Sequence, residues 1–243
     1  MLSDSERERY NRQIIAEGFG EAAQNRLKGV RACVAGAGGL GSSLALFLTA
    51  AGIGALRFAD HGAVELGNLN RQVLYSVDDV GKQKVSCLAR RLNALNPEVR
   101  IETSSQTIQE ENVLELLQGC DVVIDALDNL PTRYLLNKAA QARRLPLFHG
   151  AVHGFQGQAM TVLPRKSACL MCLYGGAETE GVIPVLGTTP AVIGCIQATE
   201  VIKFVAGIGK LLTDRLLLYD GLDMSFREVG IRRNARCAHC GPT

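Results

Sequence analysis

The sequence predicts an α/β fold, a Rossmann-like, doubly wound and mainly parallel sheet that antiparallel strands extend. Short apolar segments alternate with stretches rich in helix-forming residues along the first 150 residues or so. A glycine cluster, Gly36-Ala37-Gly38-Gly39-Leu40-Gly41, separates the first apolar segment from a helix-forming stretch. This order of strand, tight turn and helix is typical of doubly wound sheets.

The N-terminal part contains the alternating elements. Residues 5–28 are polar, with apolar residues at helical spacing, which predicts helices that precede the sheet. Strands are expected at 30–35, 56–60, 99–103, 121–125 and 145–148, and helices at 40–51, 80–95 and 131–142. Asn96-Pro97 ends the helix at 80–95, because a residue before proline disfavours helical backbone.

The pattern changes after residue 156. Strands are expected at 158–163 and 216–219, on either side of a helix at about 189–204. We expect them to extend the same sheet, so residues 1–243 form a single domain. It comprises N-terminal helices (1–28), a nucleotide-binding half (29–155) and a sheet extension (156–243). The most loop-like stretch is 175–189, which is rich in Gly, Thr and Pro.

Composition and charge limit the expected cellular compartment and the expected classes of partner. The 243 residues carry a formal net charge of +2 and contain no long Lys/Arg block, so nucleic acid is not an expected partner. The N-terminus lacks the order of a signal peptide, and no apolar run is expected to reach membrane-spanning length. We therefore expect a cytoplasmic protein. In that reducing compartment, eight cysteines favour metal or catalytic roles over disulfides.

The glycine cluster predicts a phosphate site. Gly36, Gly38, Gly39 and Gly41 match the G-x-G-x-x-G pattern, in which glycines allow backbone N–H groups at a helix N-terminus to approach phosphate. Asp60 follows Gly41 by nineteen residues, where an acid binds ribose hydroxyls. These residues alone fit an NAD-dependent dehydrogenase as well as an ATP-binding enzyme.

Further charged residues favour ATP. Arg71 and Lys84 follow Asp60 closely and would neutralise a triphosphate, which hydride transfer does not require. Taken alone, each also fits a solvated surface. Asp128 is expected at the carboxyl edge of the sheet, where a carboxylate suits Mg²⁺ bound to phosphates. The alternatives are that Asp128 N-caps the next helix, or that Asp125 holds the metal.

Two C-x-x-C pairs predict a zinc site. Four thiolates suit tetrahedral Zn²⁺, and because protein fills all four positions the site should be structural and fasten the C-terminal tail. Redox pairing is the alternative, but neither pair is expected to open a helix in a thioredoxin-like unit. His239 should be a bystander. The predicted ligands are Cys169, Cys172, Cys237 and Cys240, and the cysteines expected to be buried hydrophobes are Cys33, Cys87, Cys120 and Cys195.

In combination these motifs resemble the ThiF/MoeB/HesA family, the bacterial relatives of ubiquitin-activating enzymes. The resemblance covers nearly the whole chain. It rests on Arg9-Tyr10-Asn11-Arg12-Gln13, the glycine cluster, Asp60, Asn68-Leu69-Asn70-Arg71-Gln72, Lys84, Asp128-Asn129, Gly157-Gln158 and both cysteine pairs.

The resemblance implies an adenylyltransferase. It makes ATP and Mg²⁺ the cofactors beside Zn²⁺, and the substrate the C-terminal glycine of a ubiquitin-like sulfur carrier ending in Gly-Gly, for thiamine, molybdopterin or related sulfur transfer. The carrier carboxylate would attack the α-phosphate and release pyrophosphate. A small-molecule or tRNA-base carboxylate remains an alternative substrate. The implied ATP-binding residues are Asp60, Asn68, Arg71 and Lys84, with Asp128 at Mg²⁺ or the reacting phosphate and Arg12 reaching the partner's nucleotide in a homodimer.

Three departures from the family pattern stand out. Gly62 replaces a second acid and Gly67 a common serine, for which we expect small effects on nucleotide contacts. The stretch 173–190 contains no cysteine, whereas several relatives use one there to form a covalent link with the carrier. We therefore expect an adenylation-only enzyme whose loop at 175–189 faces the carrier, with sulfur supplied by another protein.

Overall fold

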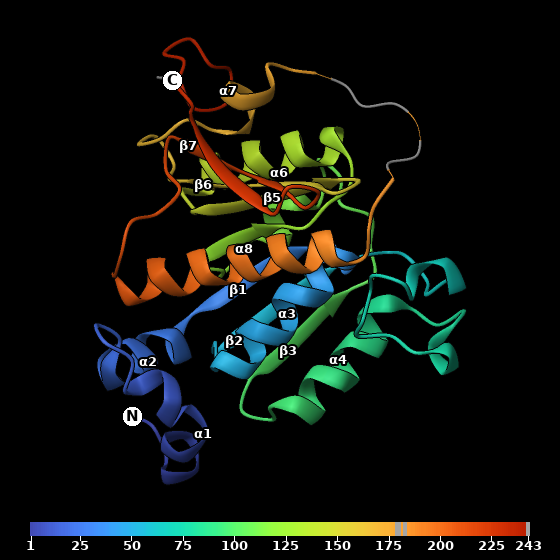
Figure 1. The fold of residues 1–243 in the computed structure, drawn as a ribbon, viewed down its shortest axis with the longest axis vertical. Helices are drawn as coiled ribbons and strands as arrows, with labels where there is room; N and C mark the ends of the chain where they lie inside the picture. The colour runs from blue at the N-terminus through green and yellow to red at the C-terminus, as the bar shows by residue number, and fades with distance from the viewer. Residues whose placement is uncertain (178–180, 182–183, 242–243) are drawn as a thin grey trace.

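A single eight-stranded sheet forms the centre of the molecule in the computed structural model, which describes residues 1–177, 181 and 184–241. Its strand order is β3-β2-β1-β4-β5-β6-β7-β8, in which the first five strands are parallel and β6, β7 and β8 continue antiparallel (Figure 1). The predicted α/β class, with a mainly parallel sheet extended by antiparallel strands, is confirmed.

The elements follow the predicted alternation. The strands are β1 (Arg31–Ala35), β2 (Ala55–Ala59), β3 (Arg100–Ser104), β4 (Val122–Asp125), β5 (Leu147–His153), β6 (Gln156–Val162), β7 (Arg215–Asp220) and β8 (Ser225–Gly230). The α-helices are α1 (Asp4–Ile14), α2 (Gly20–Gly29), α3 (Gly39–Ala51), α4 (Lys84–Leu95), α5 (Val113–Leu116), α6 (Leu130–Arg143), α7 (Leu170–Tyr174) and α8 (Thr188–Ala206), with short 3-10 helices η1 (Leu66–Asn68) and η2 (Val77–Asp79).

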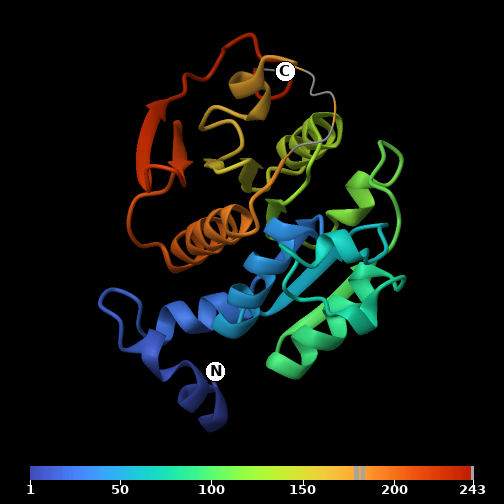
Figure 2. The same ribbon diagram turned by 45° about the vertical axis from the view of Figure 1, so that its right-hand side comes forward.

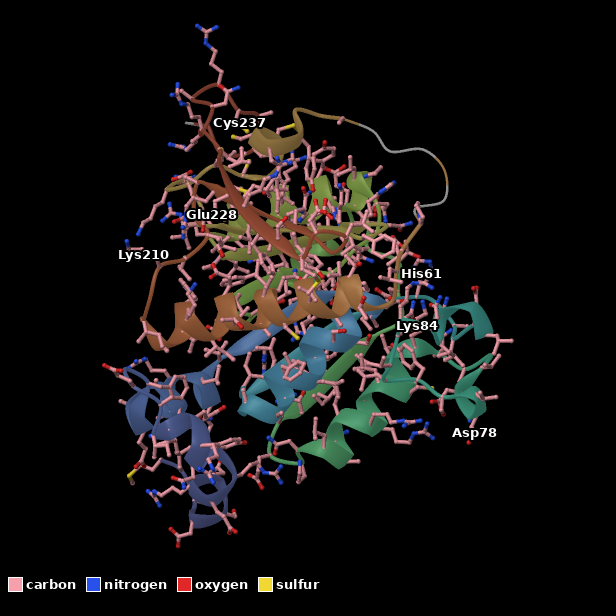
Figure 3. All side chains as sticks on the ribbon, in the orientation of Figure 1. His61, Asp78, Lys84, Lys210, Glu228 and Cys237 are labelled. Atoms are coloured by element: carbon pink, nitrogen blue, oxygen red, sulfur yellow. The ribbon has the colours of Figure 1, made fainter. Side chains whose placement is uncertain are left out.

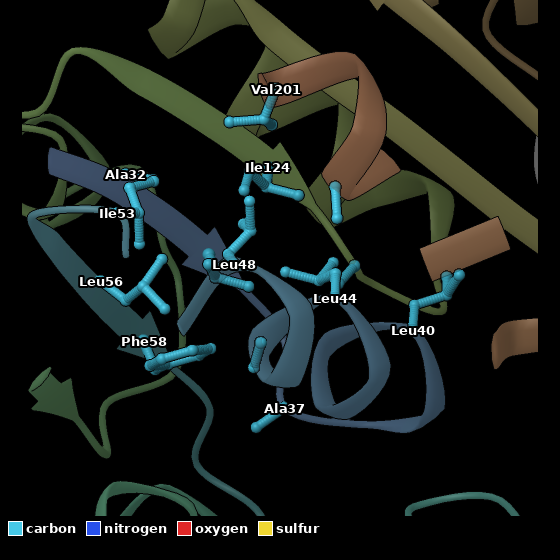
Figure 4. Close-up of a cluster of buried hydrophobic side chains, with 14 of the residues drawn as sticks. Ala32, Ala37, Leu40, Leu44, Leu48, Ile53, Leu56, Phe58, Ile124 and Val201 are labelled. Carbon is cyan, nitrogen blue, oxygen red and sulfur yellow. The ribbon is translucent and has the colours of Figure 1, made fainter. Parts of the chain in front are cut away.

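Each face of the sheet buries its own core, because successive strand side chains point to opposite faces. On β1, Ala32 and Val34 pack toward α3, α4 and α8, whereas Cys33 and Ala35 pack toward α5, α6 and the cysteine pairs. Figure 4 shows the first core, in which Leu44 and Leu48 of α3 lie over the β-strand side chains. The sequence segments between strands therefore cover both faces, as a doubly wound sheet requires.

The sheet brings distant segments to one edge. β2 and β4 flank β1 on opposite sides, so the strand order reverses there, and ligands of open α/β sheets bind outside the carboxyl ends of strands at such a point. The glycine cluster follows β1, Asp60 follows β2, and Asp128 comes shortly after β4. Parallel strands thus place three separately predicted motifs at the same edge.

One predicted helix is shorter than expected. Residues 80–83 lie outside α4, which begins at Lys84 with Gln83 as its N-cap. The physical reason is η2 together with Gly81, whose positive φ of +83° breaks the helical path. Buried Asp79 holds this turn: its carboxylate accepts hydrogen bonds from Ser76 and pairs with two arginines of α4, Arg90 and Arg91. Burial opposes the charge, but these partners hold the pKa of Asp79 well below its ordinary value.

The sequence did not predict β8, and the length of the apolar run in α8 was underestimated. By length and composition alone α8 is apolar enough to cross a membrane, contrary to the expectation that no run reaches that length. More than half of its apolar window is nevertheless buried, and it packs against α3 and the strands β5 and β6. This is the position of a core helix, which is apolar on most sides for the same reason as a membrane helix.

Candidate nucleotide and metal sites

A cleft of about 640 Å³ opens at the carboxyl edge of the parallel strands. The glycine cluster, the segment after β2, the start of α4 and the turn between β4 and α6 all line it. Gly181 and Val185 of the 175–189 loop line it too; residues 178–180 and 182–183 of that loop lie outside the described residues. His61 and Lys84, both labelled in Figure 3, line this cleft.

Two glycines of the cluster are required by the close approach of backbone segments. Gly36 has φ +100°, and a Cβ there would lie 2.4 Å from the Ala126 carbonyl oxygen at the end of β4. A Cβ on Gly41 would lie 2.1 Å from the Gly36 oxygen, so Gly41 packs beneath the loop and does not line the cleft. Gly38 and Gly39 do line it, and Gly38 is the N-cap of α3.

Asp60 joins the glycine cluster to the next segment. One carboxylate oxygen accepts the Ala37 N–H at 2.7 Å and the other accepts the Gly62 N–H at 2.8 Å. Its position at the cleft, at the end of β2, is that of an acid that binds ribose hydroxyls, and each oxygen keeps a lone pair for a further donor.

Two predicted cations line the cleft. Arg71 donates to the Gly67 oxygen at 2.8 Å and to the Asn70 side chain at 3.0 Å, which orients its guanidinium. Lys84 is the first residue of α4, and its Nζ makes no hydrogen bond or ion pair among the described residues. A Cβ at Gly62 would lie 3.4 Å from that Nζ.

The carboxylate predicted for magnesium is exposed in the cleft. Asp128 lines it, and its Oδ1 accepts a hydrogen bond from the Asn129 side chain. Asn129 itself caps α6 by accepting the Thr132 N–H at 3.0 Å, so the cap role proposed as an alternative for Asp128 belongs to Asn129. Asp125, the alternative metal ligand, is fully buried behind the cleft and is engaged by protein groups.

Sequence reasoning missed a buried polar chain behind the cleft. Arg133 of α6 lines the cleft, and its Nε lies 3.4 Å from Asp125 Oδ2. That oxygen also accepts from His149 Nδ1 at 2.7 Å, and His149 Nε2 lies 2.8 Å from the Tyr174 hydroxyl, which Gln158 also contacts. The available signal was an arginine on the buried face of a helix, which needs a polar partner.

The protonation states of this chain follow from burial and pairing. Burial opposes the charge of Asp125, but Arg133 and His149 hold its pKa below the ordinary value. Burial lowers the pKa of His149, which stays neutral, and raises the pKa of Tyr174 to about 12. The Tyr174 hydroxyl therefore donates to His149, and His149 donates to Asp125.

Besides Gly41, two predicted nucleotide residues lie outside the cleft of a single chain. Asn68 is buried, and its Oδ1 accepts the Glu65 N–H within the η1 turn. Arg12 lies exposed on α1 and makes no hydrogen bond or ion pair among the residues that the structure describes. α1 and the C-terminal tail lie at opposite ends of the molecule (Figures 1 and 2).

The four predicted zinc ligands converge at the other end. Their sulfurs lie within 4.8 Å of one another, with Cys169 3.6 Å from Cys237 and Cys172 3.5 Å from Cys240. A tetrahedron with Zn–S bonds of about 2.3 Å places its sulfurs about 3.8 Å apart, so this cysteine cluster fits zinc. Segments 68 residues apart meet here, which fastens the C-terminal tail to α7.

The surroundings of the cysteine cluster modify two expectations. Cys169 is the N-cap of α7, so the first pair does open a helix, although one of only five residues. His239 lies beside the cluster with its Nδ1 2.7 Å from the Asn137 amide, consistent with a bystander role. The cysteines outside the cluster are buried as expected, except Cys195 of α8, which is half-buried.

Comparison with known proteins gives the family. The ThiF family model matches residues 10–239. A SAMP-activating enzyme E1 of Haloferax volcanii and a sulfur carrier protein adenylyltransferase of Thermus thermophilus are each 43% identical to this chain, over 99% and 97% of it and 91% of either relative. Among solved structures, Escherichia coli MccB in complex with MccA-N7isoASN matches with a TM-score of 0.88 at 23% identity, over 99% of this chain and 76% of that chain, which shows the shared fold. The chain therefore belongs to the ThiF family.

Proposed function

We propose that this protein uses MgATP to adenylate the C-terminal glycine carboxylate of a ubiquitin-like sulfur-carrier protein ending in Gly-Gly. The observation that carries the proposal is that one cleft contains a glycine-rich helix N-terminus, Asp60, three cations and the exposed carboxylate of Asp128. The cations are Arg71, Lys84 and Arg133. The names of the two relatives at 43% identity, one of them a sulfur carrier protein adenylyltransferase, support the same reaction.

The glycine cluster and the charged residues of the cleft have roles in that reaction. Asp60 would bind the ribose, and the N–H groups at the start of α3 would face the phosphates. Arg133 is compensated by the buried Asp125, but Arg71 and Lys84 pair with no carboxylate among the described residues and are available to a polyanion. A dehydrogenase leaves these two cations without a purpose.

The chemical step needs little from the protein beyond positioning and charge. A carboxylate oxygen of the carrier attacks the α-phosphorus, the bond to the bridging oxygen breaks, and pyrophosphate leaves with the electron pair. No proton is transferred because the attacking carboxylate is already ionised. Arg71 and Lys84 would stabilise the charge that develops on the leaving phosphates.

Two metals fit the residues present. Asp128 would hold Mg²⁺ together with phosphate oxygens, and the metal would neutralise charge on the leaving group. The cysteine cluster would hold Zn²⁺ with all four positions filled by sulfur, which assigns the zinc a structural role.

A second cleft supports a peptide-like substrate. It has a volume of about 420 Å³ and runs over β5, β6, β7 and β8, lined by polar side chains that include Gln156, Gln158 and Arg227. Val152 lines both clefts, so they adjoin. An extended chain in the second cleft would present its terminal carboxylate to the nucleotide.

We further propose that no covalent carrier intermediate forms. A nucleophilic cysteine needs an accessible, activated thiolate. The stretch 173–190 has no cysteine, and burial raises the pKa of Cys195, the half-buried cysteine on α8. Sulfur would then come from another protein.

The active form would be a cytoplasmic homodimer. Arg12 lies outside the cleft of its own chain and would complete the cleft of the partner subunit. Large apolar side chains near α1 and on α3 are exposed, Ile15 by 65% and Phe47 by 55%, as expected of surfaces that a partner covers.

Carrier-dependent exchange of pyrophosphate into ATP tests the proposal. Candidate carriers ending in Gly-Gly are compared with the same carriers lacking the last glycine, and NAD binding is measured in parallel. Exchange that needs the terminal glycine is the expected result. Exchange with a small-molecule or tRNA-base carboxylate instead, or binding of NAD without ATP, would overturn the carrier assignment.

A further inference from the structure

The buried polar chain behind the cleft ends on the backbone that carries Asp128. Arg133 Nη2 donates to the Leu127 oxygen and, at 2.9 Å, to the Gly150 oxygen. The Leu127 N–H donates to Asp125 Oδ1 at 3.1 Å. The turn immediately before Asp128 is therefore held from both sides, by Asp125 and by Arg133.

The opposite end of the chain lies at the cysteine cluster. Tyr174 is the last residue of α7, two positions after Cys172, and its hydroxyl hydrogen-bonds to His149 of β5. α6 makes a second connection, because Asn137, one turn after Arg133, accepts the Leu170 N–H of α7 at 3.3 Å. The cluster and the cleft are thus connected through α7, which carries Cys172, and α6, which carries Arg133.

Apolar packing would fill this space without the cost of burying polar groups. A buried polar chain is stable where its donors and acceptors are matched, and here the hydrogen bonds run in a single direction, from Tyr174 through His149 to Asp125. The last link is an ion pair, in which Arg133 Nε lies 3.4 Å from Asp125 without a hydrogen bond. Such a chain fixes one geometry where hydrophobic contacts allow several. Its fixed end is Arg133 and the turn that bears the magnesium carboxylate.

We propose that Tyr174 and His149 are positioning residues for adenylation, which act through Asp125 and Arg133 to fix the Leu127–Asp128 turn and hence the magnesium site. The zinc-held helix α7 supplies the fixed point. This inference rests on the proposed function and adds residues that do not touch the nucleotide. It predicts that breaking the Tyr174–His149 link weakens use of Mg²⁺ while zinc stays bound.

The test uses Tyr174→Phe, which removes only the hydroxyl, and His149→Asn, whose amide keeps a donor near the Nδ1 position but cannot reach Tyr174. Tyr134→Phe is the matched control, because the Tyr134 hydroxyl donates to the Ala177 oxygen and takes no part in the chain. Each variant is assayed for zinc content, thermal unfolding, calorimetric ATP binding with and without Mg²⁺, and the Mg²⁺ requirement of exchange.

The expected result is that both Tyr174→Phe and His149→Asn keep one zinc per chain and need about tenfold more Mg²⁺, with the KM for the carrier unchanged. ATP binding without Mg²⁺ should match the wild type. Tyr174→Phe combined with Arg133→Lys should need no more Mg²⁺ than Arg133→Lys alone, because the effects of residues that act through one another are not additive.

Three outcomes would overturn the inference: a Mg²⁺ requirement equal to that of Tyr134→Phe in a folded variant, multiplicative effects in the double variant, or loss of ATP binding regardless of Mg²⁺. If Tyr174→Phe does not fold, the result with His149→Asn decides the inference. If His149→Asn does not fold, the result with Tyr174→Phe decides it. Failure of the wild-type protein to show carrier-dependent exchange would refute the proposed function, whereas Mg²⁺-dependent ATP binding would still test the positioning role.

Discussion

Two substitutions in the glycine cluster test which of its glycines the fold requires and which nucleotide binding requires. In Gly36→Ala the new Cβ would lie 2.4 Å from the Ala126 oxygen in a residue with φ +100°. The left-handed conformation costs about 1–2 kcal/mol, and relief of the backbone clash costs about 1–3 kcal/mol more. We expect Gly36→Ala to lose about 2–5 kcal/mol of unfolding free energy.

Gly38→Ala is the matched change two residues away. Its φ is −78°, and the nearest atom that a Cβ would meet is Gln72 Nε2 at 3.7 Å. Replacing glycine by alanine at an N-cap costs less than about 1 kcal/mol, so the fold should persist. The methyl group would stand in the cleft where phosphate approaches the backbone, and we expect ATP to bind at least about tenfold more weakly, or about 1.4 kcal/mol.

Urea denaturation gives the free energy of unfolding, and calorimetry gives ATP affinity at fixed Mg²⁺. Equal stability of Gly36→Ala and the wild type would refute the packing argument. If Gly38→Ala binds ATP as the wild type does, the phosphates do not approach this end of α3. If both variants lose stability equally, the cluster as a whole is structural.

Three further predictions follow from charge, metal and assembly. Asp79→Asn should lower the free energy of unfolding by about 3 kcal/mol at neutral pH. Because the folded pKa of Asp79 is lowered, this stabilisation is present above its unfolded pKa near 4 and fades as pH falls below it. The unfolding free energies of variant and wild type, measured by denaturation, should therefore converge in acid, and a difference that does not change with pH would contradict the assignment. Cys240→Ser should lose its zinc and expose the tail after β8 to protease, while Cys195→Ser keeps one zinc per chain; a zinc-free but resistant tail would exclude the structural role. Mixing inactive Arg12→Ala and Asp128→Asn chains should restore about a quarter of wild-type exchange, because each mixed dimer regains one composite site, and no recovery in verified mixed dimers would refute it.

Local patterns were sufficient for most of the parallel sheet. Apolar segments of four to eight residues and the glycine cluster predicted β1, β2 and β4 close to their observed bounds, because such strands are buried on both faces and are mostly apolar. β8 escaped prediction because all six of its residues are exposed at the sheet edge, so no hydrophobic alternation marks it. The start of α4 was misplaced because the η2 turn, fixed by Asp79, and the positive φ of Gly81 delay the helix to Lys84.

The sequence by itself predicted the residue types that meet at both candidate sites. The glycine pattern, Asp60, Arg71, Lys84 and Asp128 are read from spacing, and the two C-x-x-C pairs predicted four sulfurs around one metal. These motifs are short because glycine conformations and ligand geometry act over a few residues.

Only the tertiary structure decided which of these residues meet. Asn68 and Gly41 are buried outside the cleft lining, whereas Arg133, which no motif marked, lines the cleft. The chain from Tyr174 through His149 to Asp125 joins segments that are 25 and 24 residues apart. Strand order and register set such contacts, and both depend on the packing of the whole sheet, which local sequence does not encode.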